Sequence, residues 1–323
     1  MNAVPLLAGV VIASLLFIAK MGKSIIRRAY HGDSVHAKKV RPGTQSAILE
    51  QEGRRIAVFE LQGPLFFGSA ESLAKEVERA WRKADYCILD MRRVNEVDST
   101  GANIILHLIN SAPVRGKHLL TSYLKNNPAL WKFIELMDLK KVLKKGQFFP
   151  DTDTALEWAE EDILAQSCPL EDIRREIPLE EMEITQGFTT RELESLKRRL
   201  VLRSFPEGER LILMGDPNRD LFLLTKGSVT IQVPLPQSHR LKRLLTFGAG
   251  VIIGEMALLD AKPRSADVWV EENSQVLVLP YQEFIALSQE EPAVALKLVL
   301  NIGKVLSMNV RRSTRELQAL EEG

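Results

Sequence analysis

Residues 253–266 read IGEMALLDAKPRSA, and they carry more chemical information than any other stretch of this chain. Gly254 stands before a short helical turn, where free backbone N–H groups suit an anionic oxygen. Glu255 can accept a hydrogen bond from a sugar hydroxyl. Arg264, nine residues after Glu255 and next to a proline-ordered turn, can neutralise a phosphate with paired donors. Taken alone, Glu255 and Arg264 also fit an ordinary salt-bridged surface turn.

The residues around this stretch predict a small β-barrel or roll, because short β-rich runs recur about every ten residues and glycines separate them. Thr189–Glu192 has the spacing of a capping box, which predicts a helix from there to about Leu200. Gln282–Leu287 and Pro292–Leu317 are predicted to be helices that finish the chain. The predicted strands are Leu211–Met214, Leu221–Thr225, Ser228–Val233, Leu241–Thr246, Ser265–Val270 and Ser274–Pro280.

The first half of the chain alternates predicted strands with predicted helices, which favours an α/β domain with a mixed sheet. Tyr86–Met91 is an almost continuous apolar run, typical of a strand buried on both faces. It leads through Val94–Asp98 to Ser99 and Thr100 at the start of a helical pattern. We expect these two hydroxyls at the helix N-cap, where an added phosphate would meet the positive end of the helix dipole. A plainly capped helix is the alternative.

Residues 1–19 contain no charged side chain. As a helix, residues 2–19 would span about 27 Å, close to the hydrocarbon core of a bilayer. Basic residues follow this run and none precedes it, the reverse of a signal peptide, and the positive-inside rule places everything after Lys20 in the cytosol. We therefore expect a single transmembrane helix at 1–22, with a basic juxtamembrane segment at 23–45 that rests on lipid headgroups. A short buried helix is the alternative.

Length and composition exclude several classes of protein. The 323 residues suggest two domains, and the net charge of +1 argues against a nucleic-acid binder. Two cysteines are too few for a disulfide scaffold, and five scattered histidines predict no metal site. The sequence shows no nucleophile–base set and no glycine-rich triphosphate loop, so we do not expect an enzyme.

The stretch 253–266 resembles the phosphate-binding cassette of the cyclic nucleotide-binding family, whose pattern is close to F-G-E-[LM]-A-L-[LI]…P-R-x-A. Ile253 stands where that family usually has Phe. The resemblance implies that Gly254 and its neighbours cradle ribose and phosphate, that Arg264 binds the cyclic phosphate, and that Ser265 contacts an exocyclic oxygen or the base. Cyclic AMP is the first choice of ligand, and Ser265 leaves cyclic GMP open. The nucleotide-binding residues predicted in this way are Gly254, Glu255, Met256, Ala257, Arg264 and Ser265.

The first half resembles the STAS domain, which anti-sigma-factor antagonists share with the cytosolic tails of sulphate-permease-type (SulP) anion transporters. The order of elements and the loop Asp98-Ser99-Thr100-Gly101 carry this resemblance. Gly63–Gly68 (GPLFFG) and Ala155–Glu160 (ALEWAE) are similar to the transporter branch in particular. In the antagonist branch the serine of that loop is a kinase target, which maps to Ser99, with Thr100 beside it.

The expected fold is α+β, with two cytosolic domains and the arrangement of the C-terminal part of a SulP transporter. A mixed α/β STAS domain precedes a cyclic nucleotide-binding β-roll with flanking helices. The expected boundaries are a transmembrane helix at 1–22, a juxtamembrane segment at 23–45, a STAS domain at 46–165, a linker at 166–188, and a nucleotide-binding domain with C-terminal lid helices at 189–323.

The expected function is that of a membrane-anchored regulator in the inner membrane, which binds a cyclic nucleotide and acts on an anion transporter through its STAS domain. Its expected partners are membrane lipid, the transporter's membrane domain or another STAS-interacting protein, and a second copy of the chain. The alternative is a partner-switching signalling protein, gated by the nucleotide and phosphorylated on Ser99, with no transport role.

Overall fold

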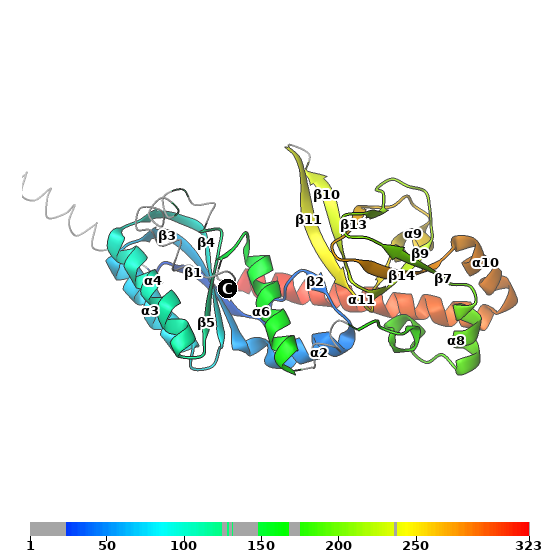
Figure 1. The fold of residues 1–323 in the computed structure, drawn as a ribbon, viewed down its shortest axis with the longest axis horizontal. Helices are drawn as coiled ribbons and strands as arrows, with labels where there is room; N and C mark the ends of the chain where they lie inside the picture. The colour runs from blue at the N-terminus through cyan, green and yellow to red at the C-terminus, as the bar shows by residue number, and fades with distance from the viewer. Residues whose placement is uncertain are drawn as a thin grey trace, which may run out of the picture. The chain divides into compact units, whose positions relative to one another are not determined.

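The computed structural model describes residues 24–124, 128, 131, 148–167, 175–235 and 238–322 of the chain. The chain forms two compact units, and each is described by itself (Figure 1). Among the described residues, the first unit contains those of 24–37, Glu50–Asp162 and the stretch from Ala319 onward, and the second contains those of Lys38–Leu49 and Ile163–Gln318. The transmembrane helix predicted at 1–22 lies outside the described residues.

The first unit is built on a mixed sheet with the strand order β1-β3-β4-β5-β6. Strands β3 to β6 are parallel, and β1 pairs antiparallel with β3 at one edge. The prediction of a fully buried strand is confirmed, since every residue from Tyr86 to Met91 is buried. The strands are β1 (Ile26–His31), β3 (Ile56–Leu65), β4 (Tyr86–Val97), β5 (His118–Ser122) and β6 (Phe148–Phe149).

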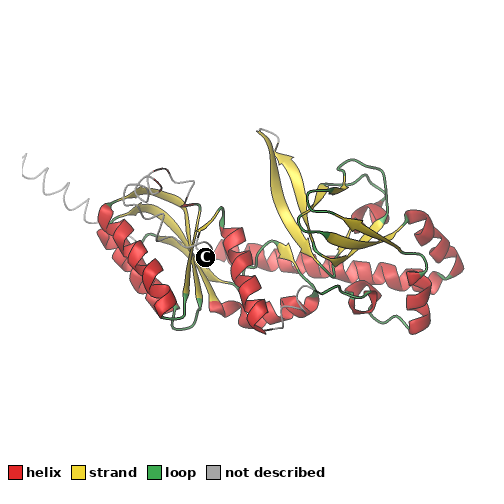
Figure 2. Cartoon of the chain, viewed as in Figure 1, coloured by secondary structure: helices red, strands yellow, loops and turns green. Residues whose placement is uncertain are grey.

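Helices cover both faces of this sheet (Figure 2). Leu73 and Val77 are four residues apart, so both point from α3 into the core that α4 also fills. On the opposite face, Tyr86 Oη donates a hydrogen bond of 2.6 Å to Asp162 of α6. The helices of this part of the chain are α2 (Gly43–Glu52), the 3-10 turn η1 (Gly53–Arg55), α3 (Phe67–Ala80), α4 (Ser99–Val114) and α6 (Thr152–Ser167).

The described part of the basic segment expected at 23–45, from Ser24 onward, contributes strands β1 and β2 to the folded units. Arg27 of β1 forms an ion pair of 2.7 Å with Glu60 of β3. Strand β2 (Lys39–Val40) pairs in parallel with β11 of the second unit. These strands were not predicted from the sequence because they are rich in positive charge. The residues that neutralise the charges, and the strands that pair with β1 and β2, lie far away in the sequence.

The second unit is a β-roll of two sheets, with strand orders β2-β11-β10-β13-β8 and β12-β9-β14-β7. Apolar side chains from both sheets, among them Leu224, Val229 and Val276, fill its interior. The mixed α/β domain and the roll confirm the predicted fold class. The strands are β7 (Val201–Phe205), β8 (Arg210–Ile212), β9 (Leu221–Lys226), β10 (Ser228–Leu235), β11 (Ser238–Gly248), β12 (Ile252–Ile253), β13 (Asp267–Val270) and β14 (Ser274–Leu279).

Helices flank the roll on both sides of it in the sequence. The predicted capping box is confirmed: Thr189 N donates to Glu192 Oε2 at 2.7 Å, and Glu192 N donates to Thr189 Oγ1 at 3.4 Å. The helices are the 3-10 turns η4 (Leu179–Glu181) and η5 (Glu183–Thr185), then α8 (Thr190–Lys197), α9 (Glu255–Asp260), α10 (Tyr281–Glu290) and α11 (Pro292–Glu322).

The linker expected at 166–188 is packed structure in its described C-terminal part. Leu179, Met182 and Ile184 are buried in one core with Leu298 and Ile302 of α11. The sequence did not predict this packing, because acidic residues alternate with the apolar residues that enter the core. The buried Asn301 of α11 strengthens the contact, because its amide nitrogen donates hydrogen bonds of 2.9 Å to the carbonyls of Ile184 and Gln186.

Helix α11 is the long helix at the end of the chain. Among the residues that the structure describes, its segment Pro292–Arg311 is the one with the length and hydropathy of a membrane span. Its Val294, Leu298 and Ile302 nevertheless belong to the core of the second unit. This contact is what the core helix of a folded domain makes.

Gly101 in the first turn of α4 permits a close approach to the end of β3, since a Cβ there would lie 2.2 Å from the Leu65 carbonyl oxygen. We predict that Gly101→Ala destabilises the first unit by about 1–3 kcal/mol through overpacking. Hydrogen exchange of β3 and β4 measures this effect locally. Gly303→Ala in α11 is the control, because a Cβ there has no neighbour within 4 Å. Hydrogen exchange of both variants at the rate of the parent protein would refute the predicted overpacking at Gly101.

Candidate functional site

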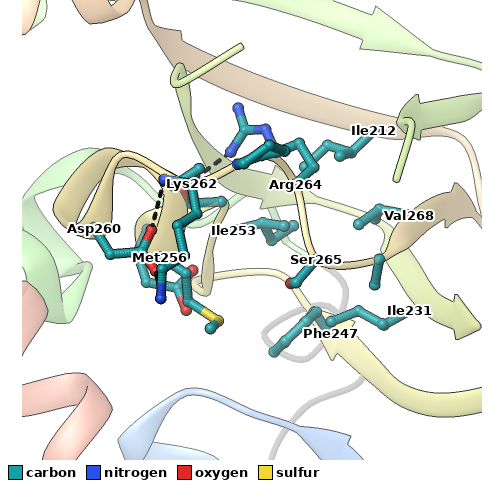
Figure 3. Close-up of a pocket in the computed structure, with 15 residues that line it drawn as sticks. Ile212, Ile231, Phe247, Ile253, Met256, Asp260, Lys262, Arg264, Ser265 and Val268 are labelled. Carbon is teal, nitrogen blue, oxygen red and sulfur yellow. Dashed lines mark hydrogen bonds and ion pairs between the residues drawn. The ribbon is translucent and has the colours of Figure 1, made fainter. Parts of the chain in front are cut away.

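A cavity of about 250 Å³ opens in the roll beside α9 (Figure 3). The structure brings all six predicted binding residues to its lining: Gly254, Glu255, Met256, Ala257, Arg264 and Ser265. Apolar side chains form the other wall: Ile212, Ile231, Phe247, Ile253 and Val268. A polar rim beside an apolar wall suits a small molecule that has one charged part and one flat, poorly hydrated part.

Gly254 is required at its position for two reasons. Its φ of 85° lies in the left-handed region, which side chains other than glycine rarely adopt. A Cβ there would also lie 2.3 Å from Nη1 of Arg264. Because Gly254 makes this turn, α9 begins directly after it and presents its first residues to the cavity.

Arg264 is buried, with 5% of its surface exposed. Its Nη1 donates to the Gly254 carbonyl at 2.9 Å, and its Nη2 donates to the Asp220 carbonyl at 2.6 Å and to Asn218 Oδ1 at 3.1 Å. Figure 3 shows the guanidinium directed away from Phe247. The charge therefore lies at the edge of the cavity, and an incoming phosphate would compete with these oxygens for its donors.

Glu255 is the acidic group on the same rim. Burial raises the pKa of its carboxyl above the usual range, and the Arg264 charge and the backbone N–H groups of Gly254 and Glu255 oppose the rise only in part. A carboxylate in this position can accept hydrogen bonds from hydroxyl groups, which would replace the water that it loses on burial.

The sequence did not predict two residues whose oxygens accept hydrogen bonds from the Arg264 side chain. Asn218 and Asp220 lie in the Asp216–Asp220 loop, more than forty positions before Arg264. The backbone connects them too: Arg264 N donates to the Asp216 carbonyl at 2.9 Å. The signal in the sequence is the polar run Asn218-Arg219-Asp220 directly before a buried strand, but nothing in it indicates the distant partner.

The loop at the start of α4 differs from the prediction in one respect. Asp98 is the N-cap, and its Oδ1 accepts a hydrogen bond of 2.6 Å from Gly101 N. Ser99 and Thr100, which were expected to cap the helix, are instead its first two residues, and both are exposed. Their hydroxyls are thus accessible at the positive end of the helix dipole. The cavity and this loop lie in different units.

Comparison with protein families defines the class of both units. Residues 47–155 match the STAS domain, and residues 202–291 match the cyclic nucleotide-binding domain. The chain therefore contains a STAS domain followed by a cyclic nucleotide-binding domain.

Three curated relatives show where such sequences occur. Glutaminase 2 of Bradyrhizobium diazoefficiens is 25% identical over 88% of this chain, which spans 45% of that protein. The cyclic AMP receptor protein of Thermus thermophilus is 32% identical over 36% of the chain and 52% of its own length. The putative sulfate transporter YvdB of Bacillus subtilis is 24% identical over 40% of the chain and 23% of its own length. The chain thus spans about half or less of the relatives that it matches.

The partly buried carboxyl of Glu255 leads to a prediction about stability. A carboxyl whose pKa is raised in the folded state contributes stability below its ordinary pKa, and that contribution is lost as the pH rises through the raised value. We predict that ligand-free Glu255→Gln is more stable than the parent protein at pH 7, with a difference that shrinks toward pH 4. Urea unfolding across this range is the measurement.

Asp260→Asn is the matched control, because Asp260 is exposed and its ion pair with Lys262 spans 3.7 Å. This change is expected to move the stability by less than about 0.5 kcal/mol at every pH. A Glu255→Gln variant that is no more stable than the parent at pH 7 would contradict the effect ascribed to burial.

Proposed function

We propose that this chain is a regulatory protein whose roll binds a cyclic nucleotide, with cyclic AMP the first choice and cyclic GMP the alternative. The observation that carries the proposal is the convergence of the six residues predicted to bind the nucleotide on one cavity, with Arg264 and Glu255 on the same polar rim. The Thermus relative, named a cyclic AMP receptor protein, supports the choice of cyclic AMP.

The chemistry of the rim matches the parts of such a ligand. The cyclic phosphate takes donors from Arg264 and from the backbone N–H groups at the start of α9. Glu255 accepts a hydrogen bond from the ribose hydroxyl, and Ser265 contacts an exocyclic oxygen or the base. The purine lies against the apolar wall that includes Ile231 and Phe247. On binding, phosphate oxygens then replace some of the three protein oxygens that accept hydrogen bonds from the Arg264 guanidinium.

The proposed target is a SulP-type anion transporter on which the STAS domain acts. The order of a STAS domain and a nucleotide-binding domain supports this target, as does the similarity to a protein named as a putative sulfate transporter. In this proposal residues 1–22 anchor the chain as a single span in the inner membrane, and both units lie in the cytoplasm. The partners are then membrane lipid and the transporter's membrane domain, with a second copy of the chain as a further partner.

A second candidate is favoured by the glutaminase comparison. An alignment over 288 of 323 residues includes parts of both domains, so the two-domain arrangement is shared with a protein that is named as an enzyme. The chain would then be the regulatory part of a larger amidohydrolase. Cys87 is not a candidate nucleophile in this proposal, because burial raises the pKa of its thiol to about 12, which keeps it protonated at neutral pH.

The exposed Ser99 supports a third, narrower possibility within the same regulatory class. A phosphate on Ser99 or Thr100 would add negative charge at the N-terminus of α4, where the helix dipole stabilises it. The STAS domain would then switch partners by phosphorylation, with nucleotide binding as the second input and no transport role.

Binding of cyclic AMP to the full chain, measured by calorimetry, tests the nucleotide proposal. We predict that Arg264→Ala weakens this binding about 30-fold or more, because the phosphate loses its buried charged partner. Arg210→Ala is the control, since Arg210 lies in the same roll, packs over Trp269 at 5.4 Å and does not line the cavity. Equal affinity of the Arg264 variant and the parent protein, with both folded by circular dichroism, would sink the assignment.

Alkaline carbonate washing of membranes distinguishes the membrane-anchored regulator of a transporter from the regulatory part of a soluble enzyme. A chain anchored through residues 1–22 stays in the pellet, because a spanning helix is not extracted by loss of electrostatic contacts. Release of the full chain into the supernatant would refute the anchor and favour the regulatory part of a soluble enzyme. A truncated chain that begins at Ser24 is the control and is expected in the supernatant.

A further inference from the structure

Arg219 lies in the Asp216–Asp220 loop, between Asn218 and Asp220, two of the residues that hold Arg264. Its neighbours Asn218 and Asp220 supply two of the three oxygens that accept from the Arg264 guanidinium. Arg219 itself does not contact Arg264 in any hydrogen bond of the described residues. Its side chain contacts two helices instead, α9 and α10.

The first of these helices is α9, which forms one edge of the cavity. Arg219 Nε donates to the Ala257 carbonyl at 3.1 Å, and Nη2 donates to the Leu258 carbonyl at 3.2 Å. A helix of six residues leaves most of its carbonyls without an intrahelical partner. Arg219 therefore satisfies groups that α9 cannot satisfy itself, and it fixes the position of the turn that carries Glu255 and Ala257.

The second helix is α10, which follows the roll. Arg219 Nη1 donates to Tyr281 Oη at 2.8 Å, and the guanidinium carbon lies 4.1 Å from the centre of the Tyr281 ring. A guanidinium at this distance from an aromatic face is attracted to it. Asp220 holds the same residue from its backbone side, because Asp220 Oδ1 accepts a hydrogen bond of 2.8 Å from Tyr281 N. The first residue of α10 is thus held by two consecutive residues of the loop.

We propose that Arg219 is a positioning residue that couples the cavity-lining helix α9 to α10. This inference rests on the proposed function, since it makes α10 the element that responds to a nucleotide in the cavity. One guanidinium holds the carbonyls of α9 and the phenol of Tyr281 at the same time, so a displacement of α9 changes the geometry at Tyr281. Arg264 links the loop to the phosphate position, and Arg219 links the loop to α10.

The pair of contacts also explains why a shorter or differently shaped cation would not serve. Three N–H donors of one planar group point to three acceptors, two on α9 and one on α10. A lysine ammonium is a point charge and lacks this fixed arrangement. The Arg219→Lys variant should therefore retain the positive charge of the loop but lose the contacts to one of the two helices.

The first test uses the full chain without ligand. Hydrogen exchange is measured in α9 and in the first turn of α10 for Arg219→Gln, Arg219→Lys and Tyr281→Phe. We expect Arg219→Gln to accelerate exchange about tenfold in both segments and to leave the core strands β9 and β14 unchanged. Tyr281→Phe should accelerate α10 alone, because the contacts to α9 remain. Arg210→Gln is the matched control, an arginine over an aromatic ring outside the cavity, and it should change neither segment.

The second test adds cyclic AMP. In the parent protein, saturating ligand should change exchange in α10 as well as in α9. In Arg219→Gln the ligand should still bind, with lower affinity, but the change in α10 should be lost. The Arg219→Lys variant is not expected to restore it. Unaltered exchange in ligand-free Arg219→Gln, or an α10 response that persists in this variant at saturation, would overturn the coupling.

These tests separate the coupling from the proposed function. Failure of the parent protein to bind cyclic AMP or cyclic GMP would refute nucleotide binding, and the ligand-free comparison would then still decide whether Arg219 joins α9 to α10. Normal binding by the parent protein together with an unchanged Arg219→Gln variant would refute the coupling alone. A variant that exchanges faster everywhere, β9 and β14 included, would show a general structural role and would also count against the proposal.

Discussion

The buried charge of Arg264 is the constraint around which the second unit is arranged. A guanidinium stays protonated in proteins, so its burial is tolerated only where acceptors surround it. The carbonyls of Gly254 and Asp220 and the side chain of Asn218 supply those acceptors. The left-handed turn at Gly254 and the course of the loop beside Arg264 follow from the need to place these oxygens. The same hydrogen bonds hold the guanidinium of a residue that lines the cavity.

A contiguous stretch of sequence was sufficient to predict the rim of the cavity, because residues 253–266 contain the turn, the short helix and the arginine together. The opposite wall was not predictable in the same way. Ile231 and Phe247 come from β10 and β11, and their contribution depends on how two sheets close on each other. The loop that holds Arg264 was missed for the same reason, since its partners lie far from it along the chain.

In the first unit, too, features set by neighbouring residues were predicted, and features set by distant residues were not. The buried strand at Tyr86–Met91 was recognised from its own composition. Strand β1 was missed, because its charges are neutralised by Glu60, thirty-three positions after Arg27. The error at the N-cap of α4 has a different origin: Asp98, Ser99 and Thr100 are all residue types that cap helices, and the pattern alone does not rank three adjacent candidates. The backbone decides between them by placing the Asp98 side chain over Gly101 N.

The parallel pairing of Lys39–Val40 with β11 has a consequence for biosynthesis. Lys39 is paired with Thr246, so the ribosome makes about two hundred residues between the two halves of this contact. At roughly 5–20 residues per second, the early segment waits about 10–40 seconds for the strand it joins. During that interval the STAS domain can complete its own core while the neighbouring dipeptide has no sheet to enter. The edge of the roll that β2 forms can therefore close only after the segment that contains β11 has been synthesised.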